Sequence, residues 1–158
     1  MFITRDIKVV AVVILMLMSV TACERLVYED VSEQPTFKPI VGSAYKIIGV
    51  VEAYGVRKHS KATIERIILM PPSAGLGGLQ FVFIGKLKLG THVVVKKVLL
   101  TNDDFFQSPY VFEVEYFGNE GLPSGMPIHI DLFRGNEGEA ELSLNPKIYQ
   151  KVVISVNR

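Results

Sequence analysis

Two polar side chains in the segment 128–132 have the spacing of a chemical pair. His129 and Asp131 alternate with apolar residues there, and because side chains alternate between the two faces of a strand, both point to the same side. With Glu113 or Glu115 on a neighbouring strand, they could form an acid–base pair or part of a metal site. The solvated outer face of a sheet gives the same pattern without any function, and we favour that simpler interpretation.

Ser124 is the candidate nucleophile. A nucleophile elbow has glycine two residues before and two residues after the serine, but here those positions hold Leu122 and Met126. Serine is also a weak nucleophile unless a base activates it. A hydrolase that uses Ser124, or the His129–Asp131 pair, is therefore an alternative hypothesis only, and we predict that the protein is not an enzyme.

Other common cofactor and ligand sites have no sequence support. Zinc sites are built from repeated Cys or His pairs, whereas this chain has one cysteine, Cys23, and three histidines in separate segments. The glycine-rich stretch 72–78 has neither spacing of a phosphate-binding loop, and a flexible loop explains it. No basic block is present for nucleic acid. We therefore predict no metal, no cofactor and no nucleic-acid partner.

Aromatic residues are concentrated between 105 and 117. Phe105 and Phe106 follow the turn-forming run Asn102-Asp103-Asp104. Core packing is the default explanation for such residues. If both phenylalanines lie on an exposed loop, they could instead anchor a partner, because buried aromatic residues dominate interface energetics.

The elements that would position these residues are strands. Segments rich in branched or alternating apolar residues are separated by Gly and Asn-Asp turn signals, and this regular spacing predicts a mainly β fold, a small antiparallel barrel or sandwich. Asn145-Pro146 predicts the start of a short C-terminal helix through Lys151, and residues 152–156 could add a last strand. The expected strands are 45–54, 63–70 (which could also be a short helix), 79–84, 91–100, 110–117 and 128–132.

Residues 87–98 contain a leucine, a glycine-threonine turn and alternating valines. This pattern resembles the corresponding turn of bacterial SH3-like domains, which are small barrels that often occur in cell-envelope proteins. The resemblance covers one hairpin, and a generic small β fold explains the same residues.

The first 22 residues have the features of a signal peptide. Arg5 and Lys8 precede a 12-residue apolar run from Val9 to Val20, which is shorter than the roughly 20 residues that span a bilayer. These 22 residues carry two basic and one acidic residue. The chain beyond them is therefore balanced in charge, and any membrane attachment must come from elsewhere than a polybasic stretch.

Val20-Thr21-Ala22-Cys23 resembles the lipobox of bacterial lipoproteins. The resemblance implies that signal peptidase recognises Val20, Thr21 and Ala22, that the Cys23 thiol receives a diacylglycerol, and that cleavage leaves Cys23 as the first residue. Two or more acyl chains anchor a protein stably. Glu24, in place of the aspartate that retains enteric lipoproteins in the inner membrane, implies an outer-membrane location.

Three segments follow from this interpretation: a signal peptide (1–22), a lipidated cysteine and extended tether (23–40), and one β-rich domain (41–158). The leading hypothesis is a non-catalytic binding or structural module. It would be lipid-anchored at the periplasmic face of the outer membrane, and its partner would be an envelope protein or the cell wall. The alternative in the same location is an immunity or inhibitor lipoprotein that neutralises an envelope-attacking enzyme.

Overall fold

The computed structural model describes residues 27–72, 78–102, 108–118, 121–133, 135–140 and 142–153. Within these residues the protein contains strands and turns but no helix, which confirms the predicted mainly β fold. The strands are β1 (Tyr28–Asp30), β2 (Ala44–Ile47), β3 (Glu52–Val56), β4 (Arg66–Met70), β5 (Phe81–Lys86), β6 (His92–Thr101), β7 (Tyr110–Phe117), β8 (Ile128–Asp131) and β9 (Tyr149–Val152).

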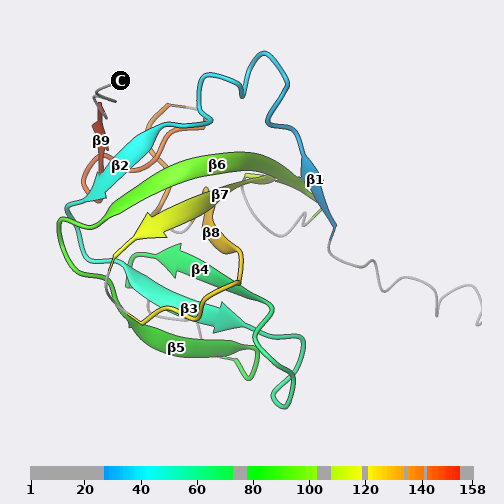
Figure 1. Cartoon of the computed structure of the whole chain (residues 1–158). Coiled ribbons are helices and arrows are strands. Elements are labelled where there is room, and N and C mark those ends of the chain that lie inside the picture. Colours follow the sequence, from blue (N-terminus) through cyan, green and yellow to red (C-terminus); the bar gives the residue numbers. More distant parts are fainter. Residues whose placement is uncertain are drawn as a thin grey trace, which may run out of the picture.

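The strands form one curved sheet in the order β5-β3-β4-β8-β7-β6-β2-β9, and β1 pairs with β6 (Figure 1). β4 and β8 run parallel, whereas the other pairs are antiparallel. The sheet is therefore open and mixed, unlike the expected antiparallel barrel or sandwich. The sequence pattern specifies which face of a strand is buried, but it does not specify which distant strand becomes the neighbour.

β6 is the longest strand and connects the two ends of the molecule. Its pairing with β7 shifts between Val95 and Lys97, a bulge that inserts Lys96. Because of this extra residue, Val93 and Val95 before the bulge and Val98 after it are all fully buried. The segment 87–98 forms a turn followed by this strand, and the SH3-like character of the fold stays a prediction.

Residues 27–40, the described part of the predicted tether, pack onto the domain. β1 pairs with the end of β6, with Tyr28 opposite Thr101, and the Val31 N–H donates a hydrogen bond to the Val98 carbonyl at 3.0 Å. Phe37 is 5% exposed and belongs to the main core. Single apolar residues among prolines and charges have no period, so the sequence does not reveal that they are buried.

The two faces of the sheet differ in what covers them. The main core lies on one face, and its largest fully buried apolar side chains are Tyr149, Phe112, Ile47, Ile67, Leu69 and Ile130. Alternate residues point to the opposite side, which we call the outer face. A smaller apolar cluster of Val56, Ile68 and Met70 lies there.

The predicted C-terminal helix is replaced by a turn and a strand. Asn145 does cap a turn, because its Oδ1 accepts the Lys147 N–H at 3.0 Å and its carbonyl accepts the Tyr149 N–H at 2.8 Å. From Tyr149 onward the backbone pairs with β2 as β9, and burial of Tyr149 in the core favours the strand over further helical turns. Residues 154–156 of the expected last strand lie outside the described residues.

Candidate functional site

Polar side chains from five strands meet on the outer face beside β8. We call this group, Tyr28, Arg66, Lys97, Glu113 and His129, the His129 cluster. Glu113 lies opposite His129 in the β7–β8 pair and opposite Lys97 in the β6–β7 pair. Lys97 Nζ is 3.2 Å from Glu113 Oε1, and His129 Nε2 is 4.0 Å from Glu113 Oε2.

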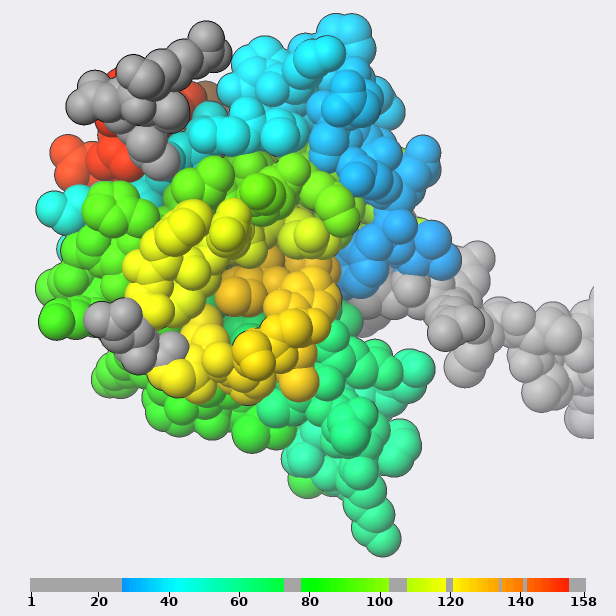
Figure 2. Space-filling view, in the orientation of Figure 1, coloured from blue at the N-terminus to red at the C-terminus, as the bar shows by residue number. Residues whose placement is uncertain are grey.

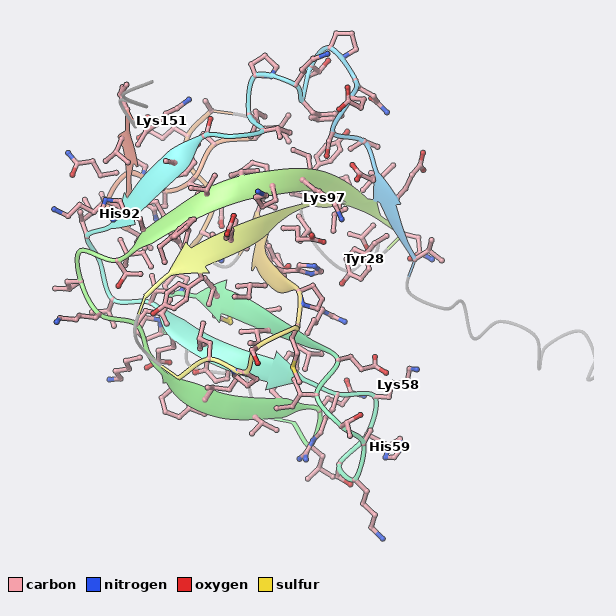
Figure 3. All side chains as sticks on the ribbon, in the orientation of Figure 1. Tyr28, Lys58, His59, His92, Lys97 and Lys151 are labelled. Atoms are coloured by element: carbon pink, nitrogen blue, oxygen red, sulfur yellow. The ribbon has the colours of Figure 1, made fainter. Side chains whose placement is uncertain are left out.

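Tyr28 closes the His129 cluster from β1. Its ring packs edge-on against the His129 ring, with centroids 5.2 Å apart, and the Arg66 guanidinium lies 5.5 Å from the Tyr28 centroid. Figure 3 labels Tyr28 and Lys97, which lie on the same side of the molecule as β8. The short strand β1 is therefore held by side-chain contacts as well as by its pairing with β6.

His129 is buried without full hydrogen bonding. It is 3% exposed, and neither its Nδ1 nor Arg66 Nε has a hydrogen-bond partner in the described part of the chain. Burial lowers the pKa of His129 to about 4, and the positive charges of Arg66 and Lys97 lower it further in the same direction. His129 is therefore neutral at neutral pH, and protonating it would place an additional positive charge beside two others.

The second feature is a pocket beside the end of β7. β8 pairs with residues 111–114 of β7, so the segment 115–117 has no strand on that side within the described residues. The connection from β7 to β8 passes there and leaves a pocket of about 620 Å³, lined by Glu113, Glu115 and Ser124 among others. Figure 2 shows the hollow, framed by the yellow and gold residues of β7, the connection and β8.

The structure brings some of the predicted catalytic residues together and separates others. Ser124 and Glu113 line the same pocket, but His129 does not line it. The Ser124 side chain is exposed and has no hydrogen-bond partner among the described residues. Asp131 lies opposite Val111, two positions along β8 from His129. The structure thus brings His129 and Glu113 together, whereas Ser124 is not hydrogen-bonded to a base among the described residues.

Several predicted site residues fall beyond the described part of the chain. Val20, Thr21, Ala22 and Cys23 lie outside the described residues, as do Phe105 and Phe106. Among the described residues, no group of three or more His, Cys, Asp or Glu side chains could hold a metal ion. In the same residues no helix is long and apolar enough to cross a membrane.

The third feature is an exposed apolar surface at the end of the molecule opposite β1. We call it the far-end patch: Ile48 (43% exposed), Val50 (51%), Leu89 (59%) and Phe117 (55%). Two backbone hydrogen bonds hold together the segments that carry Ile48, Val50 and Leu89. The Gly90 N–H donates to the Ile47 carbonyl, and the Leu87 N–H donates to the Val51 carbonyl. Phe117 lies opposite His92, the first residue of β6.

Figure 3 labels His92 and Tyr28 on opposite sides of the molecule. The far-end patch lies at the start of β6, and the His129 cluster extends from Lys97 in the middle of β6 to Tyr28, which pairs with the end of that strand. The sequence only partly predicts these two sites. Leu89, a large apolar residue at a turn tip between Lys88 and Gly90, is a local signal of an exposed contact. Tyr28 and Arg66 carry no such signal, because only the pairing of β1 and β4 within the sheet brings them to His129.

No protein-family model matches this sequence, and no curated protein and no solved structure matches the chain.

Proposed function

We propose that this protein is a lipid-anchored cell-envelope lipoprotein that acts as a non-catalytic binding module. Acylated Cys23 would hold it at the periplasmic face of the outer membrane, and the far-end patch would be its docking surface. The observation that carries the proposal is the position of that patch, at the opposite end of β6 from the strand that follows the cysteine.

The distance from Cys23 to the fold supports this arrangement. Tyr28, the first residue of β1, is five residues after Cys23, and five residues span at most about 17 Å. The β1 end of the domain would therefore stay close to the lipid headgroups. The ten residues of β6 extend over about 30 Å at 3.3 Å per residue, so the far-end patch would face away from the membrane.

The chemistry of the far-end patch supports binding rather than catalysis. Four large apolar side chains at one end of a fold form the kind of exposed cluster that marks protein interaction sites. Lys88 and His92 at its border are polar, as the rim of an interface usually is. We propose an envelope protein as the partner, because such apolar side chains bind poorly to the polar glycan strands of a cell wall.

Site-specific photocrosslinking in membranes tests the proposal. A photoreactive amino acid is placed at Leu89 in the full-length chain, and a matched variant carries it at Leu79, which is 74% exposed and lies before β5. We expect one defined envelope protein to be captured from Leu89 and not from Leu79, and the capture to be lost when Ile48→Lys is added. Equal capture from both positions, or none from either, would contradict the proposal.

The identity of the captured protein separates the two non-enzymatic hypotheses. A structural or transport component of the envelope supports a general binding module. Capture of one envelope-degrading enzyme, together with protection of cells when that enzyme is expressed, would instead support an immunity or inhibitor lipoprotein. A β-rich domain with an SH3-like hairpin at residues 87–98 is compatible with both.

A further inference from the structure

The two end strands of the sheet differ in how they are protected. β5 has the sequence FVFIGK and one charged residue, Lys86, at its end. β9 is shorter and exposes Gln150 and Lys151. Short length and exposed charge are the usual means of preventing an edge strand from pairing with another chain. β9 therefore has this protection along its length, whereas β5 has it only at one end.

The backbone of β5 offers hydrogen-bonding groups on its open side. The Arg57 N–H donates to the Gln80 carbonyl at 3.0 Å, so the backbone of Gln80 faces β3. In an antiparallel pair the facing residues alternate, so the Phe81 carbonyl and the N–H and carbonyl of Phe83 point away from β3. The Phe81 N–H is already used, because it donates to the Gly78 carbonyl at 3.1 Å. No described strand pairs with that side of β5.

The side chains of Phe81 and Phe83 lie on the outer face of the same edge. Phe83 is 53% exposed, and its ring packs edge-on against Tyr54 with centroids 5.6 Å apart. Phe81 is partly buried against the cluster of Val56, Ile68 and Met70. A strand added beside β5 would cover both aromatic rings and extend the outer face.

We propose that β5 pairs with β5 of a second copy of this chain, antiparallel and centred on Val82, so that the sheet continues across two molecules. In this register each Phe83 lies opposite Phe81 of the other copy. Each Phe83 N–H can donate to a Phe81 carbonyl, and two aromatic cross-strand pairs form on the outer face.

Charge and local geometry favour this register. Lys86, the one charged residue of β5, lies four residues from the central Val82, so the two copies of Lys86 fall on opposite sides of the two-fold axis and no like charges meet. Lys86 also retains its partner Glu52, at 3.7 Å. The bulge between β3 and β5 falls at Ile84, because Gly85 pairs with Ala53 and Phe83 with Tyr54. The three central residues 81–83 therefore remain regular.

Pairing of this kind would be weak in solution. Among the described residues near β5, Phe83 and Leu79 are the strongly exposed apolar side chains, and two such side chains are few for a stable interface, which buries roughly 1,200 Å² or more. Confinement of two copies to one membrane raises their effective concentration. This part of the inference depends on the proposed lipid anchor, whereas the register does not.

Disulfide trapping in the full-length protein tests the register. Val82→Cys places a thiol at the two-fold axis, where directly opposed Cα atoms are about 4.5 Å apart, within the range for a disulfide. We expect oxidation of membranes to convert most of this variant to a covalent dimer. The matched variant Gln150→Cys, on the exposed edge β9, should dimerise at least tenfold less, and adding Phe83→Lys to Val82→Cys should reduce its dimer to the same level.

A second pair of variants keeps the test valid if Val82→Cys does not fold. Two differently tagged chains, one with Phe81→Cys and one with Phe83→Cys, should crosslink to each other more than either crosslinks to itself. Fatty-acid labelling of the same membranes separates the two proposals. Labelled protein without either crosslink would overturn β5 pairing and leave the anchor intact. Unlabelled protein that still crosslinks would support β5 pairing and contradict the anchor.

Discussion

Folded proteins usually bury apolar residues and expose polar ones, and the two ends of β6 break this rule in opposite ways. At the β1 end, the protein buries His129 beside Arg66 and Lys97 and leaves its Nδ1 without a hydrogen bond. At the other end, it exposes four large apolar side chains in the far-end patch. Buried polar groups and exposed apolar clusters are the informative exceptions in a folded protein.

The difference shows what each end contributes. The unsatisfied Nδ1 of His129 destabilises the fold, and apolar burial elsewhere, such as that of Phe37, must offset this cost. The far-end patch leaves apolar area in water, which only a partner would remove. The β1 end should therefore respond to mutation through stability, and the far end through binding.

The largest effect is expected from Phe37→Ala. Phe37 is buried in the core and its ring packs against Tyr110 at a centroid distance of 5.1 Å. Removing it should lower the free energy of unfolding by about 3–5 kcal/mol, as measured by urea denaturation. Phe83→Ala provides a control at an exposed phenylalanine and should lower it far less. Equal, small losses would instead support the predicted tether, 23–40, around Phe37.

A pH effect of about 3 kcal/mol is expected from His129. Its pKa is lowered from 6.5 to about 4 in the folded protein, so between these values the unfolded chain binds the proton more readily. Protonation of His129 should not affect stability above about pH 6.5. Its destabilising contribution should grow as the pH falls, and it should level off below about pH 4, where both states are protonated.

The variant His129→Phe isolates this effect from the carboxylates, which titrate in both proteins. Between pH 6.5 and pH 4 the variant should lose about 3 kcal/mol less stability than the parent chain, because it has no proton to bind. If the free energy of unfolding changed equally with pH in the two proteins, His129 would not be desolvated as described.

A smaller effect is expected from Lys97→Met. Lys97 Nζ contacts Glu113 Oε1, but its side chain is 46% exposed, and exposed ion pairs contribute about 0–1 kcal/mol. Stability at neutral pH should therefore change little. Removing this positive charge should raise the pKa of His129, which an NMR titration of its ring protons measures. A lower pKa of His129 in the variant, or a pKa that the titration cannot distinguish from the parent value, would contradict the placement of Lys97.

The smallest effect on stability is expected from Leu89→Lys. Leu89 is 59% exposed at a turn, so the free energy of unfolding should change by less than about 0.5 kcal/mol. Partner capture by a photoreactive residue at Val50 in this variant should nevertheless be lost. Retained capture at unchanged stability would remove the functional difference between the two ends.

The sequence predicted the strands that alternate and missed the elements that depend on distant partners. The interval 110–117 matches β7 residue for residue, because Phe112 and Val114 alternate with Glu113 and Glu115. The single strand expected at 45–54 is two strands, β2 and β3. Residues 48–50 leave the sheet there, and a continuous run of branched residues does not show that break.

The polar residues were harder to predict than the strands. Asn136 is 1% exposed, and it donates to the carbonyls of Leu69 and Asp131 and accepts from the Tyr149 hydroxyl. In the sequence it is indistinguishable from an exposed turn residue after Gly135. The bulge at Lys96 did have a signal, since the buried valines Val95 and Val98 are three residues apart instead of two.

The central claim is that Cys23 carries the lipid that places the β1 end beside the membrane. Its most direct test is the intact mass and N-terminal sequence of the mature protein purified from membranes. We predict a chain that begins at Cys23 and is heavier than its polypeptide by the mass of the attached acyl groups. A mature chain that begins at another residue, or that has a free thiol at Cys23, would contradict the account.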